Sequence, residues 1–250
     1  MQLHPLVLVR GLLLLTLAAI WIVALPRGRV GLAFVSVLVV VAAWKAHAAW
    51  WRASARKVVA TYPLPAFLRD KLRARYPQLD DAQVRDVERA LRQFFAASAA
   101  AGGKFVAMPS KVVDALWHEF ILHTRGYEAF CRRAFGRLLH HTPAEVMPPD
   151  GKQYESRRAG LRRAWYWSCR EEGIDPRKPD RLPLLFALDT TLAIAGGYKY
   201  VPDCKLLGSG RGDTHCAAGF GCGSSCGSSG DGGSSDGCSS SGCSSCGGGD

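Results

Sequence analysis

Apolar residues dominate the first fifty positions in two long runs, which a short polar turn at residues 26–29 separates. The first run extends from Leu6 to Leu25, and the second extends from Val30 to Trp44 and on to about residue 50. About 20 consecutive apolar residues are enough to cross a bilayer. We therefore predict two transmembrane helices, over about 6–25 and 30–50, which form a hairpin within residues 1–51.

The residues around the second run support this prediction. Trp44, Trp50 and Trp51 suit the aromatic belt at a membrane interface, where Lys45 and Arg52 can extend their charged ends to water. A cleaved signal peptide is the alternative for the first run, but a second apolar run follows it and no cleavage site of small residues is present. A buried hairpin in a protein core is the alternative for both runs.

Positive charge near the two runs predicts the orientation. The turn carries only Arg27 and Arg29, whereas four basic residues follow the second run: Lys45, Arg52, Arg56 and Lys57. Because positively charged flanks stay in the cytoplasm, we predict a two-span protein of a bacterial inner membrane, with both termini and the following domain in the cytoplasm.

From about residue 52 to 205 apolar residues recur at helical spacing, and no alternating strand pattern is present. Prolines, acidic residues and paired glycines delimit the expected helices. These are 64–76, a long helix from 80 to about 101, two helices between 110 and 143, 154–172 and 182–195, with 198–202 as a candidate extended segment. The sequence therefore predicts an all-α fold: a transmembrane hairpin, a bundle of five or six helices at 52–205, and a tail at 206–250.

The two central helices hold most of the candidate chemistry. Ser110 follows a proline and is the expected N-cap of the first one, whose apolar face comprises Val112, Val113, Leu116, Trp117, Phe120 and Ile121. Asp114, His118 and Arg125 line one edge of that face. After an interruption at Gly126, a second apolar face comprises Tyr127, Phe130, Cys131, Phe135 and Leu138 and ends at His140 and His141.

The string from His118 to His123 invites comparison with the His-Glu-x-x-His helix of zinc proteases, whose histidines are four positions apart. Here the spacing is five, which turns the second imidazole about 140° away. We therefore reject a metalloprotease site and expect His123 to be a core histidine with a hydrogen-bond partner.

A better-spaced set is Asp114 with His118, joined by His140 or His141 from the end of the next helix. One carboxylate with two imidazoles suits zinc or iron and leaves a position for water. The alternative is a structural pair in which Asp114 orients His118, with His140 and His141 near a helix C-terminus that favours their charged form.

The residues between Val112 and Cys204 resemble the glycine-rich domain-containing proteins of plants, fungi and bacteria. The resemblance rests on Asp114, Trp117, His118, Thr124, Tyr127, Phe130, Cys131, His140, His141 and Pro143, and a glycine-rich tail fits it as well. It implies an architecture and no particular reaction.

The helical domain is basic, because residues 52–205 contain 27 Lys and Arg against 17 Asp and Glu. Four arginines on the 154–172 helix, Arg157, Arg158, Arg162 and Arg163, are candidates for contact with lipid headgroups or other phosphates. Beside a membrane, such charge favours anionic headgroups over nucleic acid. A solvated arginine-rich surface is the alternative.

The tail changes composition abruptly, since 23 of the 32 residues from 219 to 250 are Gly or Ser. Such a segment cannot bury a core, so we predict disorder. Its six cysteines are Cys216, Cys222, Cys226, Cys238, Cys243 and Cys246. Cys222, Cys226, Cys243 and Cys246 could give four thiolates to zinc, and in a reducing cytoplasm labile metal binding or reversible oxidation is favoured over fixed disulfides. A biased tail without a site is the alternative.

Three functions fit these features. The sequence favours a membrane-anchored interaction or scaffold protein with an unidentified protein partner. The alternatives are a metal-dependent enzyme centred on the Asp114 and histidine set, and a metal or redox sensor that acts through the cysteine tail.

Overall fold

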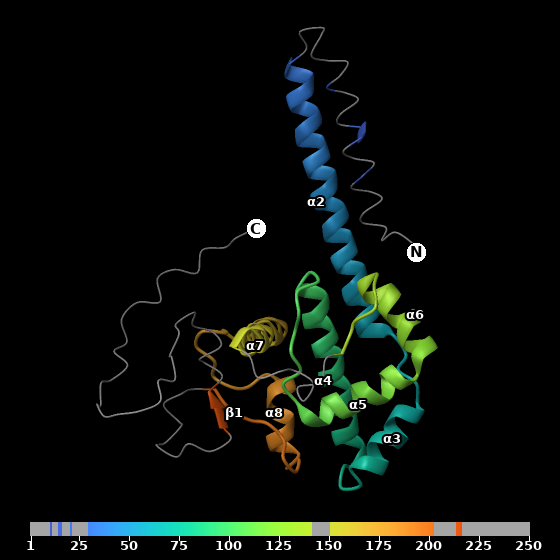
Figure 1. Ribbon diagram of the computed structural model, residues 1–250, viewed down its shortest axis with the longest axis vertical. Helices are drawn as coiled ribbons and strands as arrows, with labels where there is room; N and C mark the ends of the chain where they lie inside the picture. The colour runs from blue at the N-terminus through green and yellow to red at the C-terminus, as the bar shows by residue number, and fades with distance from the viewer. Residues whose placement is uncertain are drawn as a thin grey trace, which may run out of the picture.

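The computed structural model of the protein describes residues 30–141, 151–202 and 214–216, together with Gly11, Leu15, Thr16 and Trp21. Within these residues the fold is mainly helical, as predicted (Figure 1). The elements are α2 (Val30–Thr61), α3 (Phe67–Arg75), α4 (Asp81–Ala100), α5 (Lys111–Leu122), α6 (Thr124–Phe135), α7 (Gly151–Glu171), α8 (Leu184–Thr191), β1 (Lys199–Val201) and β2 (Thr214–Cys216).

The pair of strands departs from the all-α prediction. β1 falls within the candidate extended segment and pairs in parallel with β2, which places Tyr200 opposite His215. Strands of three residues are too short to produce an alternating pattern in the sequence.

Helix α2 is a single element of 32 residues that projects far beyond the rest of the fold (Figure 1). From Phe34 to Thr61 it is long and apolar enough to cross a membrane, and among the described residues it is one candidate span. The first predicted span lies outside the described residues apart from four single positions. Two spans and a cytoplasmic orientation therefore stay predictions.

The helix that contains the second apolar run is longer than the predicted 30–50. α2 continues without interruption to Thr61, and Ala55 and Val59 are buried against the other helices. Arg92 of α4 ends it by donating hydrogen bonds of 2.7 Å to the carbonyl groups of Val59 and Tyr62. The apolar segment and the helical domain thus share one continuous helix.

Aromatic side chains fill the core between α4, α5 and α6. The ring of Phe94 lies 4.7 Å from that of Trp117, and the ring of Phe95 lies 4.8 Å from that of Phe130. Phe120 is fully buried beside them. Each of these residues lies on a face that helical spacing predicts, so the core of the domain follows from the sequence.

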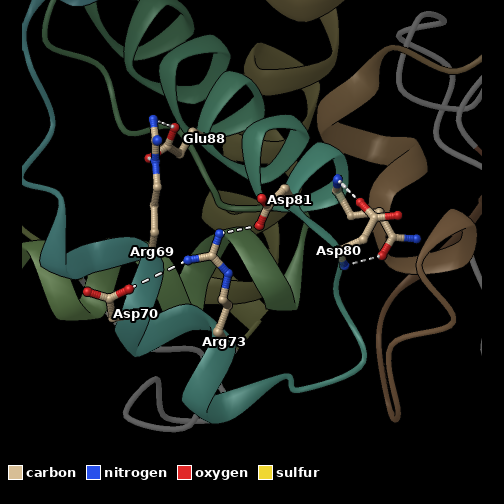
Figure 2. A network of polar contacts seen from close by, with 7 residues as sticks. Arg69, Asp70, Arg73, Asp80, Asp81 and Glu88 are labelled. Atoms are coloured by element: carbon tan, nitrogen blue, oxygen red, sulfur yellow. Dashed lines mark hydrogen bonds and ion pairs between the residues drawn. The ribbon is translucent and has the colours of Figure 1, made fainter.

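Polar contacts fix the start of α4. Asp80 and Gln83 form the capping box expected from an acidic residue at this boundary, with bonds of 2.8 and 2.9 Å. Figure 2 shows the ion pairs that join α3 to α4: Arg69 reaches Glu88 at 2.8 Å, and Arg73 lies between Asp70 and Asp81.

The central helix pair is divided at a different residue from the one predicted. α5 ends at Leu122, because His123 adopts a non-helical conformation, and Gly126 lies in the first turn of α6. His123 is therefore exposed and not a core residue; its ring meets Phe67 edge-on at 5.4 Å. The missing side chain at Gly126 makes room for this imidazole, since a Cβ there would lie 2.2 Å from it.

The remaining helix ends differ from the predictions by a few residues. α3 begins at Phe67 and not at 64, and α8 covers only Leu184–Thr191. α6 ends at Phe135, where Gly136 takes the left-handed conformation of a C-cap. His140 and His141 consequently lie in the following loop and not at a helix end.

Candidate metal centre

Helix α5 supplies two of the candidate ligands from one edge. Asp114 and His118 are one turn apart, and the Nδ1 atom of His118 lies 3.3 Å from a carboxylate oxygen of Asp114. Both side chains keep contact with solvent, with 31% of Asp114 and 42% of His118 exposed. The i, i+4 spacing that predicted this juxtaposition holds.

The third group is His141, from the loop after α6. Its Nε2 atom lies 2.8 Å from the other carboxylate oxygen of Asp114, and its ring centre lies 4.2 Å from that of His118. Ligand atoms of these three residues all lie within 4.8 Å of one another. His141 is only 10% exposed, so the cluster has a buried side and an open side.

Two aromatic residues hold the loop that carries His141. The indole of Trp117 donates to the hydroxyl of Tyr127 at 3.1 Å, and that hydroxyl donates to the carbonyl of Leu139 at 2.5 Å. The indole also meets the ring of His141 edge-on at 4.5 Å. Burial raises the pKa of Tyr127, so its hydroxyl stays protonated and able to donate. The backbone two residues before His141 is thereby fixed to the core.

The position of α5 depends on a buried carboxylate from α8. Asp189 accepts hydrogen bonds from the Ser110 hydroxyl at 2.7 Å and from the backbone amides of Lys111 and Val112 at 2.7 and 3.2 Å. It also accepts one from the amide of Tyr198. A negative charge at a helix N-terminus satisfies free amide groups and opposes the helix dipole. Asp189 therefore holds the start of the helix that carries Asp114 and His118.

The hydrogen bonds of His118 indicate which of its nitrogen atoms can bind a metal. Nδ1 lies 2.9 Å from the carbonyl oxygen of Asp114, which can only accept. The proton of a neutral imidazole is then on Nδ1, and Nε2 keeps a lone pair. Metal-binding histidines usually donate their other N–H group in this way.

The remaining histidines predicted for this region do not join the cluster. His140 is exposed and does not belong to the group of close ligand atoms that His141 completes. Its neighbour His141, and not His140, makes the contact with Asp114. His123 also lies outside the cluster, which agrees with the rejection of a metalloprotease site.

The cysteines fall into two groups. Cys131 and Cys169 are free and fully buried, and burial raises the pKa of both thiols, that of Cys169 to about 12. Cys216 is disulfide-bonded, so at this position the cysteine is oxidised and not a free thiolate; whether that oxidation is reversible, as expected, stays a prediction. The four tail residues proposed for zinc, Cys222, Cys226, Cys243 and Cys246, lie outside the described residues.

The arginines of α7 are partly engaged within the domain. Arg157 donates to the Tyr198 hydroxyl at 3.2 Å, Arg163 donates to the carbonyl of Phe105 at 2.6 Å, and Arg162 lies 4.0 Å from Glu155. These three arginines and Arg158 are half-buried. Contact between these residues and phosphate or lipid stays a prediction.

The sequence missed two supports of the cluster, the Trp117 and Tyr127 pair and Asp189. Helical spacing places Trp117 and Tyr127 on apolar faces. Because a buried tyrosine needs a hydrogen-bond partner for its hydroxyl, the position of Tyr127 on such a face was the signal that could have indicated this contact. Nothing in the sequence connects Asp189 with Ser110.

A family model described as UCP032817-like matches residues 54–220, which is more than half of the chain. No curated protein and no solved structure matches the chain. The matched range contains α5, α6, the loop with His141 and every residue of the cluster.

Proposed function

We propose that this chain, which belongs to the UCP032817-like family, is a membrane-anchored protein that binds a transition-metal ion, preferentially zinc, through Asp114, His118 and His141. The observation that carries the proposal is the convergence of the three ligand atoms within 4.8 Å. Anchoring through α2 rests on its length and apolar composition.

The donor set fits zinc in number and kind. One carboxylate and two neutral imidazoles are a common set in zinc sites that keep a water molecule as fourth ligand. Ligand atoms around a tetrahedral zinc ion are about 3.3 Å apart for bonds of about 2.0–2.1 Å. The observed 2.8 Å between Nε2 of His141 and the Asp114 carboxylate is shorter than this value, and the 3.3 Å contact of His118 is made by its protonated Nδ1, so a bound ion would require small shifts that present Nε2 of His118 to it.

The exposure of the cluster bears on what a bound ion would do. Zinc with an open position lowers the pKa of its water and supports hydrolysis. Asp114 and His118 face solvent, whereas His141 is shielded by Trp117. This difference in exposure favours a site with one open coordination position over a closed structural site. Hydrolysis is therefore the reaction class to test.

The resemblance to glycine-rich domain-containing proteins remains part of the proposal. In its support, five of the residues that carry it build the cluster or its supports, namely Asp114, Trp117, His118, Tyr127 and His141, and Cys131 is buried beside Tyr127. A scaffold role for the tail and a sensor role for its cysteines rest on residues outside the described part of the chain. The metal-binding function therefore has the stronger support.

The test is the metal content of the full chain purified in a neutral detergent. We expect about one equivalent of zinc by mass spectrometry of the digested protein, and its loss in His118→Ala, His141→Ala and Asp114→Asn. His140→Ala is the matched control, because it removes an exposed imidazole one position from the cluster. Equal zinc content in all variants, or none in the wild type after incubation with zinc, would overturn the proposal.

A further inference from the structure

We propose that the protein binds the headgroup of an anionic phospholipid in a hollow beside α2. The hollow has a volume of about 310 Å³ and lies between the membrane-proximal part of α2, the loop after α4 and the segment that follows α6. These three segments lie on the side of the domain from which α2 projects (Figure 1). We call it the interfacial hollow.

Its charge fits a phosphate group. Arg52, Lys104 and Arg137 line the interfacial hollow, and no acidic side chain is among its lining residues. All three are exposed. Arg137 donates to the carbonyl of Gly103 at 3.0 Å, which directs one guanidinium nitrogen to the loop and leaves other N–H groups for a ligand.

The position of the hollow along α2 indicates the source of the phosphate. The helix rises 1.5 Å per residue, so the 22 residues from Val30 to Trp51 span roughly 33 Å, which matches the hydrocarbon thickness of a bilayer. With the membrane anchoring proposed above and a span that ends at Trp51, Arg52 follows directly and lies at the level of the headgroups. A phosphate bound to Arg52 therefore comes from the lipid itself.

The remaining walls also suit a lipid. Trp51, Phe135 and Leu139 contribute apolar surface to the hollow, against which the glycerol backbone can lie. Trp50, 62% exposed, and Leu138, 42% exposed, are neighbours of lining residues in the sequence and offer apolar surface for contact with acyl chains. Gly102 and Gly103 both have positive φ angles, and Gly102 has no atom within 4 Å of a Cβ position, so the loop leaves space at this wall.

The location differs from that of the α7 arginines, which the sequence favoured for headgroup contact. Arg157 and Arg163 already donate to groups within the domain. The interfacial hollow combines three exposed basic side chains with the apolar end of the candidate span. This combination is typical of basic headgroup pockets at the membrane surface.

The experiment is a titration of the detergent-purified full chain with dioleoyl phosphatidylglycerol or dioleoyl phosphatidylcholine, read by native mass spectrometry. We expect phosphatidylglycerol to bind more tightly. Replacing Arg52, Lys104 and Arg137 with Gln should weaken its binding about fivefold for each charge removed. A control chain with Arg85→Gln, Arg125→Gln and Arg177→Gln loses the same net charge from exposed positions outside the hollow.

Each outcome decides the proposal. Selective loss in the hollow variant supports it. Equal loss in both variants would mean delocalised attraction and would overturn it, as would equal binding of the two lipids by the wild type. In a parallel arm, displacement of the lipid by millimolar inorganic phosphate would overturn the lipid as ligand and point to free phosphate. Zinc content, measured on the same samples, separates this result from the fate of the metal centre.

Discussion

The hydroxyl of Ser110 donates a 2.7 Å hydrogen bond to the carboxylate of Asp189, 79 residues further along the chain. Asp189 is 3% exposed, and the same carboxylate accepts from two amides of the first turn of α5. One side chain of α8 thus closes the N-terminus of the helix that carries Asp114 and His118.

Replacing Asp189 with Ala should strongly destabilise the domain. The change leaves several buried donors without an acceptor, and each such loss costs about 1–3 kcal/mol. We expect the free energy of unfolding to fall by about 3–5 kcal/mol in a denaturant titration. Asp180→Ala is the control, because Asp180 is 75% exposed and should change stability by less than about 0.5 kcal/mol. Similar results for both variants would contradict the capping role.

Tyr127→Phe should weaken metal binding while leaving the core packed. The variant removes the hydroxyl that joins the Trp117 indole to the Leu139 carbonyl, and His141 loses its positioning. Supporting contacts of this kind change metal affinity by about 10–100-fold. A zinc titration against a competing chelator measures the change. Tyr166→Phe, at a position 45% exposed on α7, is the control and should leave zinc affinity unaltered.

Arg92→Met should loosen the junction between α2 and the domain. Arg92 makes two hydrogen bonds to carbonyls at the end of α2, where a positive charge is favoured. We expect a loss of about 2–3 kcal/mol in thermal or denaturant unfolding. Arg89→Met, one turn earlier, removes only an exposed ion pair with Asp86 and should cost less than about 1 kcal/mol. A larger effect at Arg89 would refute the assignment.

Glu171 should make stability depend on pH. It lines a second hollow of about 430 Å³ between α2, α4 and α7. Partial desolvation of the carboxyl and the neighbouring Glu172 charge, opposed by Arg56, together raise the pKa of Glu171 to about 7. A pKa above that of the unfolded chain means that the folded state holds the proton more tightly. Its contribution to stability is therefore fully present below about pH 4.5 and is lost as the pH rises through about 7.

Glu171→Gln should accordingly remove this part of the pH dependence. Compared with the wild type, the variant should gain stability at pH 8 relative to pH 5, as measured by melting temperature in the two buffers. Glu128→Gln on α6 is an exposed control that leaves the wild-type profile unchanged. Parallel profiles for wild type and Glu171→Gln would show that Glu171 does not titrate in this range.

Cys131 and Cys169 should resist alkylation in the folded protein. Both are fully buried, and the raised pKa of each thiol keeps it protonated at pH 8, where a thiolate is needed for reaction. Iodoacetamide followed by peptide mapping should label neither in buffer and both in guanidinium chloride. Labelling of either residue in buffer would show local opening of its helix.

The positions of residues that follow the helical repeat could be predicted from the sequence. The positions of residues that depend on tertiary contacts could not. Helical spacing gave the α5 face, the Ser110 cap and the Asp114 and His118 pair, because these depend only on neighbours within one turn. The choice between His140 and His141 depends on a loop whose path is set by Tyr127 and Leu139, so no local pattern could make it. His123 was misplaced for a related reason, because the helical wheel was extended one residue past the end of α5.

The continuity of α2 has a mechanical consequence. One helix runs from the apolar segment to buried Ala55 and Val59, so no break in α2 separates this segment from the domain. If the segment spans a bilayer, as proposed above, a tilt or rotation of the span would turn the domain with it and would set the distance of Asp114 and His118 from the lipid. A ligand would then reach the cluster from the water layer beside the membrane.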